Sequence, residues 1–232
     1  MTARELTDLE REAQHAAHTL EGAPAEDIMR WAADTFGSAF AVTCSMHDAI
    51  LVDLAARVAP GLDVLFLDTG YHFAETIGTR DAVAASYDVN LITLTPDLTV
   101  PQQDARFGAR LHDRDPDSCC RMRKVEPLER ALRNYDAWAT GLRRVDSPLR
   151  ADTPVVAFDS RRGKVKVNPL AAWSDDDLHA YVAEHNVLTH PLLQAGYPSI
   201  GCAPCTRAVA WDEDPRAGRW AGSAKTECGL HT

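Results

Sequence analysis

The sequence predicts an α/β fold, a parallel sheet with helices packed on both faces. Short apolar runs suited to buried strands, at residues 38–44, 64–67 and 89–94, alternate with segments of helical periodicity at 47–59 and 75–87. Strands that alternate with helices in this way form parallel sheets, because each helix carries the chain back to the start of the next strand. A chain of 232 residues is long enough to bury a full core of this kind.

The other segments complete this domain. The further predicted elements are helices at residues 3–21, 25–36, 120–134 and 174–186 and extended segments at residues 137–140, 154–158 and 164–167. Ser174 is a good N-cap for the last helix, since three aspartates follow it in the first turn. Residues 96–118 lack clear periodicity and are predicted as a loop or short helix. We expect one domain over residues 1–210 and a flexible tail, docked on it, over residues 211–232.

Charge and composition limit the kinds of molecule that this protein is expected to bind. The net charge of −10 argues against general binding to nucleic acid. Residues 106–150 nevertheless hold 11 Arg/Lys and 7 Asp/Glu, and a cationic segment in an acidic protein indicates a small anionic ligand. The chain shows no signal peptide and no apolar run of membrane-spanning length, so we expect a cytoplasmic protein that does not bind membranes. Cysteines stay reduced in the cytoplasm, where they more often bind metals or act in catalysis.

Five of the six cysteines lie in the second half and form two kinds of candidate site. Cys119 and Cys120 are adjacent, and Cys202 and Cys205 form a CxxC turn. Together they offer four thiolates, the ligand set of either a Zn²⁺ ion or a [4Fe–4S] cluster. Cys228 lies close to the end of the sequence with cationic neighbours that favour its thiolate, so we expect it to act as a nucleophile.

Two turns follow predicted strands at the carboxyl edge of the sheet, where such folds bind ligands. The first contains Cys44 and Ser45, and the second contains Leu67, Asp68 and Thr69. Hydroxyls and backbone amides at the start of a helix can bind phosphate and ribose. The first turn lacks the glycines of a phosphate-gripping loop, so a pyrophosphate-binding ATP site is not expected. A buried apolar thiol is the alternative interpretation of Cys44.

Several motifs, in order along the chain, resemble those of the thioredoxin-dependent assimilatory adenylyl-sulfate (APS) and phosphoadenylyl-sulfate (PAPS) reductases. They are Leu67-Asp68-Thr69-Gly70-Tyr71-His72-Phe73-Ala74-Glu75-Thr76, Cys119-Cys120-Arg121-Met122-Arg123-Lys124-Val125-Glu126-Pro127-Leu128, Thr140-Gly141-Leu142-Arg143-Arg144, Cys202-Ala203-Pro204-Cys205 and Glu227-Cys228-Gly229-Leu230-His231. The tandem cysteines, the CxxC and the terminal ECGLH together resemble the iron–sulfur branch of the family, which acts on APS. The resemblance implies an adenine-nucleotide-binding fold of the PP-loop type, also called adenine nucleotide alpha hydrolase-like.

The resemblance also implies roles for individual residues. Cys119, Cys120, Cys202 and Cys205 are expected to hold a [4Fe–4S] cluster, and Cys228 is expected to attack the sulfur of APS and form an S-sulfocysteine. Lys124 and His231 are expected to assist it. The residues expected to bind the substrate are Cys44, Ser45, Leu67, Asp68, Thr69, Arg143, Arg144, Arg216 and Arg219. Arg216 and Arg219 are expected to lie one helical turn apart. Thioredoxin, or a related dithiol protein, is the expected reductant.

Two alternatives stay open at this point. The first is the same chemistry with PAPS as the substrate. The second is a zinc-stabilised nucleotide-binding or interaction domain in which Cys228 is inert; the tandem cysteines are unlike the paired CxxC of zinc ribbons. The sequence also leaves open whether the protein forms a homo-oligomer.

Overall fold

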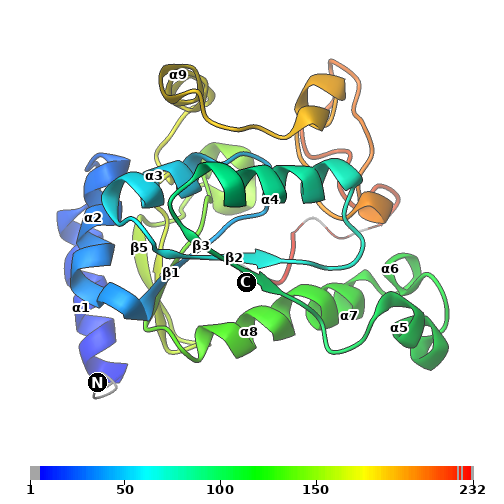
Figure 1. Cartoon of the computed structure of the whole chain (residues 1–232), viewed down its shortest axis with the longest axis horizontal. Coiled ribbons are helices and arrows are strands. Elements are labelled where there is room, and N and C mark those ends of the chain that lie inside the picture. Colours follow the sequence, from blue (N-terminus) through cyan, green and yellow to red (C-terminus); the bar gives the residue numbers. More distant parts are fainter. Residues whose placement is uncertain (1–5, 224, 226, 231–232) are drawn as a thin grey trace.

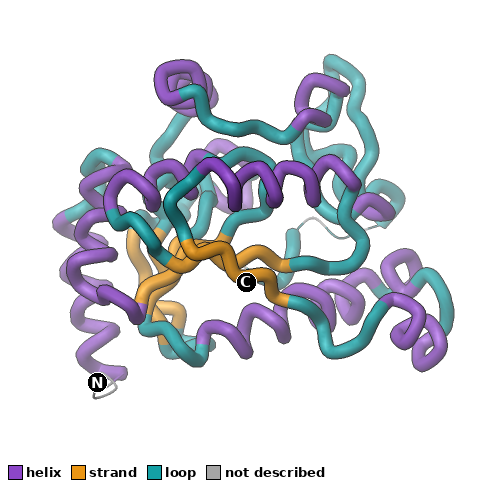
Figure 2. Tube along the Cα trace, in the orientation of Figure 1, coloured by secondary structure: helices purple, strands orange, loops and turns teal. Residues whose placement is uncertain are grey.

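A six-stranded sheet forms the centre of the computed structural model, which describes residues 6–223, 225 and 227–230. The strands are β1 (Phe40–Thr43), β2 (Asp63–Leu67), β3 (Asn90–Leu94), β4 (Ala137–Ala139), β5 (Val156–Asp159) and β6 (Lys164–Val167). Their order is β3-β2-β1-β4-β6-β5 (Figures 1 and 2). Four neighbouring pairs are parallel, and β5 pairs with β6 antiparallel at one edge. The predicted parallel sheet is therefore confirmed, with one antiparallel edge strand added.

Helices cover both faces of the sheet, as the alternating pattern predicts (Figure 1). The helices are α1 (Leu6–Thr19), α2 (Ala25–Phe36), α3 (Ile50–Val58), α4 (Ala74–Ser86), α5 (Val100–Phe107), α6 (Leu111–Arg114), α7 (Pro116–Cys120), α8 (Glu126–Leu132) and α9 (Asp175–His185). The first three helices pack their apolar faces on one side of the sheet and form the larger core. On the other side, Leu128 and Leu132 of α8 pack on Trp138 of β4 in a smaller core.

The segment before the cysteine pair is more helical than its sequence pattern predicts. Residues 96–118 contain α5, α6 and most of α7. The α5 helix begins with a capping box, in which Thr99 and Gln102 exchange side-chain and backbone hydrogen bonds. The expected helix at residues 120–134 begins earlier, at Pro116, and contains a π-helical turn at Arg121–Val125. This wider turn shifts the orientation of α7 relative to α8, and such turns frequently occur at functional sites.

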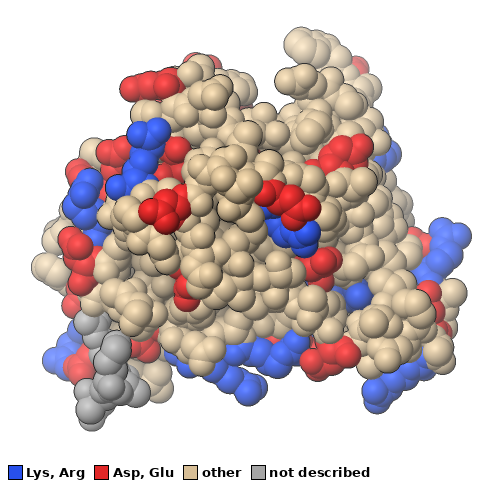
Figure 3. Space-filling view, in the orientation of Figure 1, with Lys and Arg blue, Asp and Glu red and all other residues tan. Residues whose placement is uncertain are grey.

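Charged side chains are spread over the surface of the molecule. Acidic and basic side chains are interspersed over the face shown in Figure 3, and basic ones gather along its lower edge, beneath α8. No helix among the described residues is both long and apolar enough to cross a membrane.

Candidate active site

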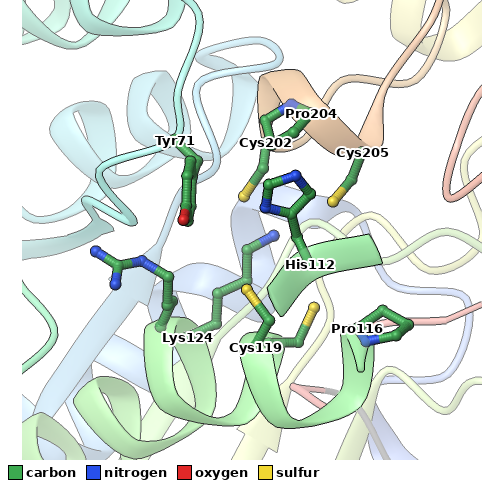
Figure 4. Close-up of a pocket in the computed structure, with 10 residues that line it drawn as sticks. Tyr71, His112, Pro116, Cys119, Lys124, Cys202, Pro204 and Cys205 are labelled. Carbon is green, nitrogen blue, oxygen red and sulfur yellow. The ribbon is translucent and has the colours of Figure 1, made fainter. Parts of the chain in front are cut away.

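A small pocket beyond the carboxyl ends of β1 and β2 brings the two cysteine pairs together (Figure 4). Cys119 and Cys120 lie on α7 on one side, and the Cys202–Cys205 turn faces them from the other. The other residues that line the pocket are Tyr71, His112, Pro116, Arg123, Lys124 and Pro204. Segments 82 residues apart in the sequence, from Cys120 to Cys202, therefore line one pocket.

Local hydrogen bonds hold both cysteine segments in place. The Asp115 carboxylate accepts a hydrogen bond from the backbone N–H of Ser118 at 3.0 Å, which caps α7 just before the cysteine pair. On the opposite side, the N–H of Ala203 donates to the carbonyl of Tyr71 at 2.7 Å. The Thr69 hydroxyl lies 3.3 Å from the sulfur of Cys202. The predicted nucleotide turn and the CxxC turn are thus joined directly.

The four cysteines supply suitable metal ligands, although their present geometry is not that of a closed metal site. Among the described residues, no group of three His, Cys, Asp or Glu side chains is close enough to hold a metal ion as it stands. The cavity between the sulfurs measures about 10 Å³, room for about one water molecule. Four soft thiolates are nevertheless the donor set that zinc and iron–sulfur clusters use. The donor chemistry therefore fits either group, and either one requires the thiols to move.

Cys228 is buried in the structure, against the back of the cysteine pair. Its side chain packs with Cys120 and Trp220 in a small cluster, and Leu230 covers the cluster from the side. A hydrogen bond from the Cys120 thiol lowers the pKa of Cys228 to about 5; burial opposes this shift, and the nearby amine of Lys124 adds to it. These contacts favour the thiolate form of Cys228 in this structure. The segment that carries it is docked on the domain in this structure.

Two cationic side chains face the cysteines without a carboxylate partner. The amine of Lys124 points toward the sulfurs (Figure 4), and among the described residues neither Lys124 nor Arg219 forms an ion pair with a carboxylate. Burial acts to lower the pKa of Lys124, but the thiols of Cys202 and Cys228 outweigh it and raise that pKa. Burial lowers the pKa of Arg219. The Lys124 amine and the Arg219 guanidinium can therefore bind an anionic ligand without first losing a carboxylate partner among the described residues.

The Arg219 guanidinium owes its position to a glycine. It packs so closely on Gly201 that a Cβ atom there would lie 2.3 Å from Nη2 of the arginine. Its Nη1 donates to the Ser199 hydroxyl at 3.2 Å and to the Ile200 carbonyl at 3.3 Å. Arg216 and Arg219 lie one turn apart, since the N–H of Arg219 donates to the carbonyl of Arg216 at 2.8 Å, but residues 214–220 form turns and one short β-bridge instead of a helix.

The other predicted arginines are already paired with carboxylates and do not line the cysteine pocket. Arg143 forms ion pairs of 2.8 Å with Asp146 and 2.9 Å with Asp175. Arg144 pairs with Glu21 at 2.8 Å. Arg216 pairs with Glu227 at 3.2 Å. An anionic ligand would have to displace these carboxylates in order to bind the arginines.

The two predicted nucleotide turns lie at the expected edge of the sheet, but they differ in their exposure. Thr69 is fully buried, Leu67 and Asp68 are half-buried, and Ser45 is exposed. The Asp68 carboxylate accepts the N–H of Gly70 at 2.9 Å. Cys44 packs partly buried against the core, and burial raises its pKa to about 12. The Cys44 thiol is therefore protonated at neutral pH.

The structure also brings in residues that sequence patterns did not single out. Arg123 is almost fully buried, and it donates hydrogen bonds to the carbonyl of Thr69 and to the side chain of Gln103. It belongs to the cationic segment that already indicated an anion site, but nothing in its own position distinguished it from its neighbours. Tyr71 and His112 line the pocket as well. The predicted His231 lies outside the described residues.

Comparison with known proteins agrees with these features. A model of the phosphoadenosine phosphosulfate reductase domain matches residues 38–208. A Streptomyces coelicolor protein named adenosine 5'-phosphosulfate reductase is 62% identical over 98% of this chain and 97% of its own. A Mycobacteroides abscessus protein of the same name is 54% identical over 99% of this chain and 97% of its own.

Solved structures give the same fold. The crystal structure of a phosphoadenylyl-sulfate reductase from Candida auris, a phosphate complex, has a TM-score of 0.74 at 27% identity, covering 88% of this chain and 98% of that one. An FMN adenylyltransferase from Candida glabrata has a TM-score of 0.56 at 13% identity, covering 88% of this chain and 66% of that one, and indicates only a shared fold. The family model and the two relatives together show that this chain belongs to the phosphoadenosine phosphosulfate reductase family.

Proposed function

We propose that this protein is an adenylyl-sulfate reductase, which reduces adenosine 5'-phosphosulfate to sulfite and AMP in sulfate assimilation. The observation that carries the proposal is the position of Cys228. Its thiol lies near the Lys124 amine, and among the described residues this lysine forms no ion pair with a carboxylate. A nucleophile next to an uncompensated cation suits a substrate whose reacting sulfur bears anionic oxygens. The names of the close relatives favour APS over PAPS.

The chemistry assigned to Cys228 balances without a bound redox cofactor. Its thiolate attacks the sulfur of APS, the bond from that sulfur to the phosphate oxygen breaks, and AMP leaves with the electron pair. The enzyme then holds an S-sulfocysteine. A thiolate of thioredoxin, or of a related dithiol protein, attacks the Cys228 sulfur, and sulfite leaves with the electron pair of the broken bond. The second thiol of the reductant resolves the mixed disulfide, so the dithiol supplies both electrons.

The side chains around Cys228 bind and orient the substrate in this proposal. Lys124 and Arg219 neutralise the sulfate and phosphate oxygens, and Arg219 offers the planar fork that suits such groups. The turns that contain Cys44, Ser45, Leu67, Asp68 and Thr69 bind the adenylyl end, at the edge of the sheet where such folds bind nucleotides. Arg143, Arg144, Arg216 and His231 are proposed as further substrate contacts on the strength of the family resemblance.

We propose a [4Fe–4S] cluster on Cys119, Cys120, Cys202 and Cys205. When bound, it ties α7 to the CxxC turn and adds negative charge at the sulfate end of the pocket. Lys124 lies between these cysteines and Cys228, where it offsets that charge for an anionic substrate. Lys124→Ala is therefore expected to depress turnover and to leave the iron content intact. Loss of iron together with activity would assign Lys124 a structural role.

The tail must open during the cycle. Cys228 is 8% exposed in the structure, and a protein reductant needs direct access to its sulfur. We propose that residues 1–210 form the reductase domain and that residues 211–232 act as a tail, which closes over the pocket for the first step and opens for the second. Cytoplasmic location is part of the same proposal, since reduced thioredoxin and free thiols belong to that compartment.

The test is sulfite release from APS and, separately, from PAPS, by anaerobically purified protein supplied with thioredoxin. Iron and acid-labile sulfide are assayed on the same sample. We expect turnover of APS, about four irons per chain and absorption near ~400 nm. Cys228→Ser is expected to abolish sulfite release. A colourless, zinc-loaded protein that is inactive on both substrates would support the zinc-stabilised alternative instead.

A further inference from the structure

We propose that Glu227 is a positioning residue, whose carboxylate is clamped by Arg150, Arg216 and Ser147 and holds Cys228 in its closed place. The proposal rests on the proposed function of Cys228 and adds residues that set its geometry. Glu227 is the chain neighbour of Cys228, so their Cα atoms are about 3.8 Å apart. Fixing the glutamate therefore fixes the backbone from which the nucleophile projects.

Three side chains converge on the Glu227 carboxylate. Arg150 donates to both of its oxygens, from Nε at 2.9 Å and from Nη2 at 2.8 Å. Arg216 approaches Oε2 at 3.2 Å, and the Ser147 hydroxyl donates to Oε1 at 3.2 Å. A two-point arginine–carboxylate pair restricts orientation as well as distance. The clamp thus fixes the plane of the Glu227 carboxylate, and not only its position.

The clamp is largely buried, and its residues Ser147 and Arg150 belong to the folded domain. The side chains of Glu227, Arg150 and Arg216 are 12%, 15% and 16% exposed, so solvent screens the charges only weakly. Ser147 and Arg150 belong to the connection after β4, at and within a 3₁₀ turn at Pro148–Arg150. Arg150 also donates to Asp146 at 3.1 Å, which fixes the arginine from behind. The tail is therefore attached to the domain that carries the substrate pocket.

A second polar contact near Cys228 is weaker. Lys225, whose side chain is 9% exposed, donates to Asp117 of α7, but the Asp117 side chain is 80% exposed. An ion pair with one partner so exposed to solvent contributes less to stability than a buried one. Trp220 and Leu230 add apolar contacts. Of the polar contacts close to Cys228 in the described tail, the Glu227 clamp is the one that combines burial with several charge-assisted hydrogen bonds.

The tail can open only if this clamp breaks, so a change at Glu227 is expected to alter how easily a reagent reaches Cys228. Glu227→Gln keeps the size of the side chain but removes its charge. The test is the rate at which iodoacetamide alkylates Cys228 in the anaerobic, iron-loaded protein without substrate, followed by mass spectrometry of the Cys228 peptide. We expect alkylation to become about tenfold faster, because loss of a charged hydrogen-bond acceptor favours the open tail.

Glu213→Gln is the matched control. Glu213 also accepts two hydrogen bonds from one arginine, Arg207, both at 2.9 Å, and it lies in the same region of the chain. That pair is more exposed than the Glu227 clamp, with side chains 47% and 36% exposed, and neither residue belongs to the small cluster that contains Cys228. The control removes the same charge, and Cys228 alkylation is expected to change less than about twofold. A general effect of net charge would instead accelerate both variants equally and would overturn the proposal.

Steady-state kinetics separate positioning from substrate binding. Glu227→Gln is expected to lower kcat for sulfite release with unchanged iron content. A lower KM with unchanged kcat would mean that Glu227 merely competes with the substrate for the arginines, which would overturn the positioning role. Arg150→Lys, which keeps the charge but loses the two-point contact, is the second variant if Glu227→Gln fails to fold. Since alkylation needs no turnover, an inactive enzyme with a clamp-dependent Cys228 would refute the proposed function and leave the clamp intact.

Discussion

Replacement of Arg123 by methionine is expected to destabilise the protein, because this arginine joins three segments of the pocket wall. The side chain is 3% exposed and comes from the π-helical turn after α7. Its Nε donates to the carbonyl of Thr69, and its Nη1 donates to the Leu98 carbonyl at 3.3 Å and to Gln103 Oε1 at 2.9 Å. The guanidinium also lies 5.1 Å from the centre of the Tyr71 ring.

The size of the effect follows from these contacts. Methionine fills much of the same volume but leaves two backbone carbonyls and one amide oxygen without the donor, and each lost partner in a buried place costs about 1–3 kcal/mol. Relief of the desolvation of the buried charge offsets part of this cost. A net loss of about 3 kcal/mol in the free energy of unfolding is expected. For a chain of this length, that corresponds to a fall in Tm of roughly 6–12 °C.

The assay is thermal unfolding of wild-type and variant protein with equal iron content, followed by circular dichroism. Arg121→Met is the matched control, since Arg121 is two residues away and its side chain is 60% exposed in a pair with Glu126. Exposed pairs contribute at most about 1 kcal/mol, so the control is expected to lower Tm by no more than about 4 °C. Equal shifts for the two variants would refute the structural role of Arg123.

Two further predictions concern the geometry and the protonation of the site. Gly201→Ala is expected to reduce sulfite release at least tenfold, because the new Cβ atom displaces the Arg219 guanidinium. Gly78→Ala is the control: no atom lies within 4 Å of a Cβ atom placed there, so activity is expected to stay unchanged. In metal-free protein, the alkylation rate of Cys228 is expected to change little around pH 7, because the hydrogen bond from the Cys120 thiol lowers the pKa of Cys228 well below that of an ordinary thiol. A rate that rises about tenfold per pH unit would indicate an ordinary thiol.

The helices and strands that were predicted correctly are those specified by residues close together in the sequence. The alternation of buried strands and helices predicted β1, β2 and β3, and the serine–aspartate start predicted the first turn of α9, where Ser174 and Asp177 form a capping box. Residues 96–118 were harder, because α6 and α7 are too short to show a period. The start of α5 did carry a usable signal, the Thr99 to Gln102 capping spacing with Pro101 inside it.

The pairing of charged residues could not be predicted, because it depends on contacts between distant segments. Arg143 and Arg216 look alike in sequence as candidate anion-binding residues, yet each is paired with a carboxylate. Arg219 differs because it packs against Gly201 and, among the described residues, forms no ion pair with a carboxylate. The sequence therefore identified the candidate anion-binding arginines. Only the fold shows which of them already pair with a carboxylate.

The tandem cysteines show how one helix can connect two functions. Consecutive residues of an α-helix point about 100° apart, so Cys119 and Cys120 have different neighbours in this structure. Cys119 interacts most strongly with Cys202 and Cys205, whereas Cys120 packs on Cys228. In this arrangement, a single cysteine on α7 would contact either the CxxC turn or Cys228 of the tail, but not both. The adjacent cysteines therefore place two candidate metal ligands on one helix, and one of them contacts the proposed nucleophile.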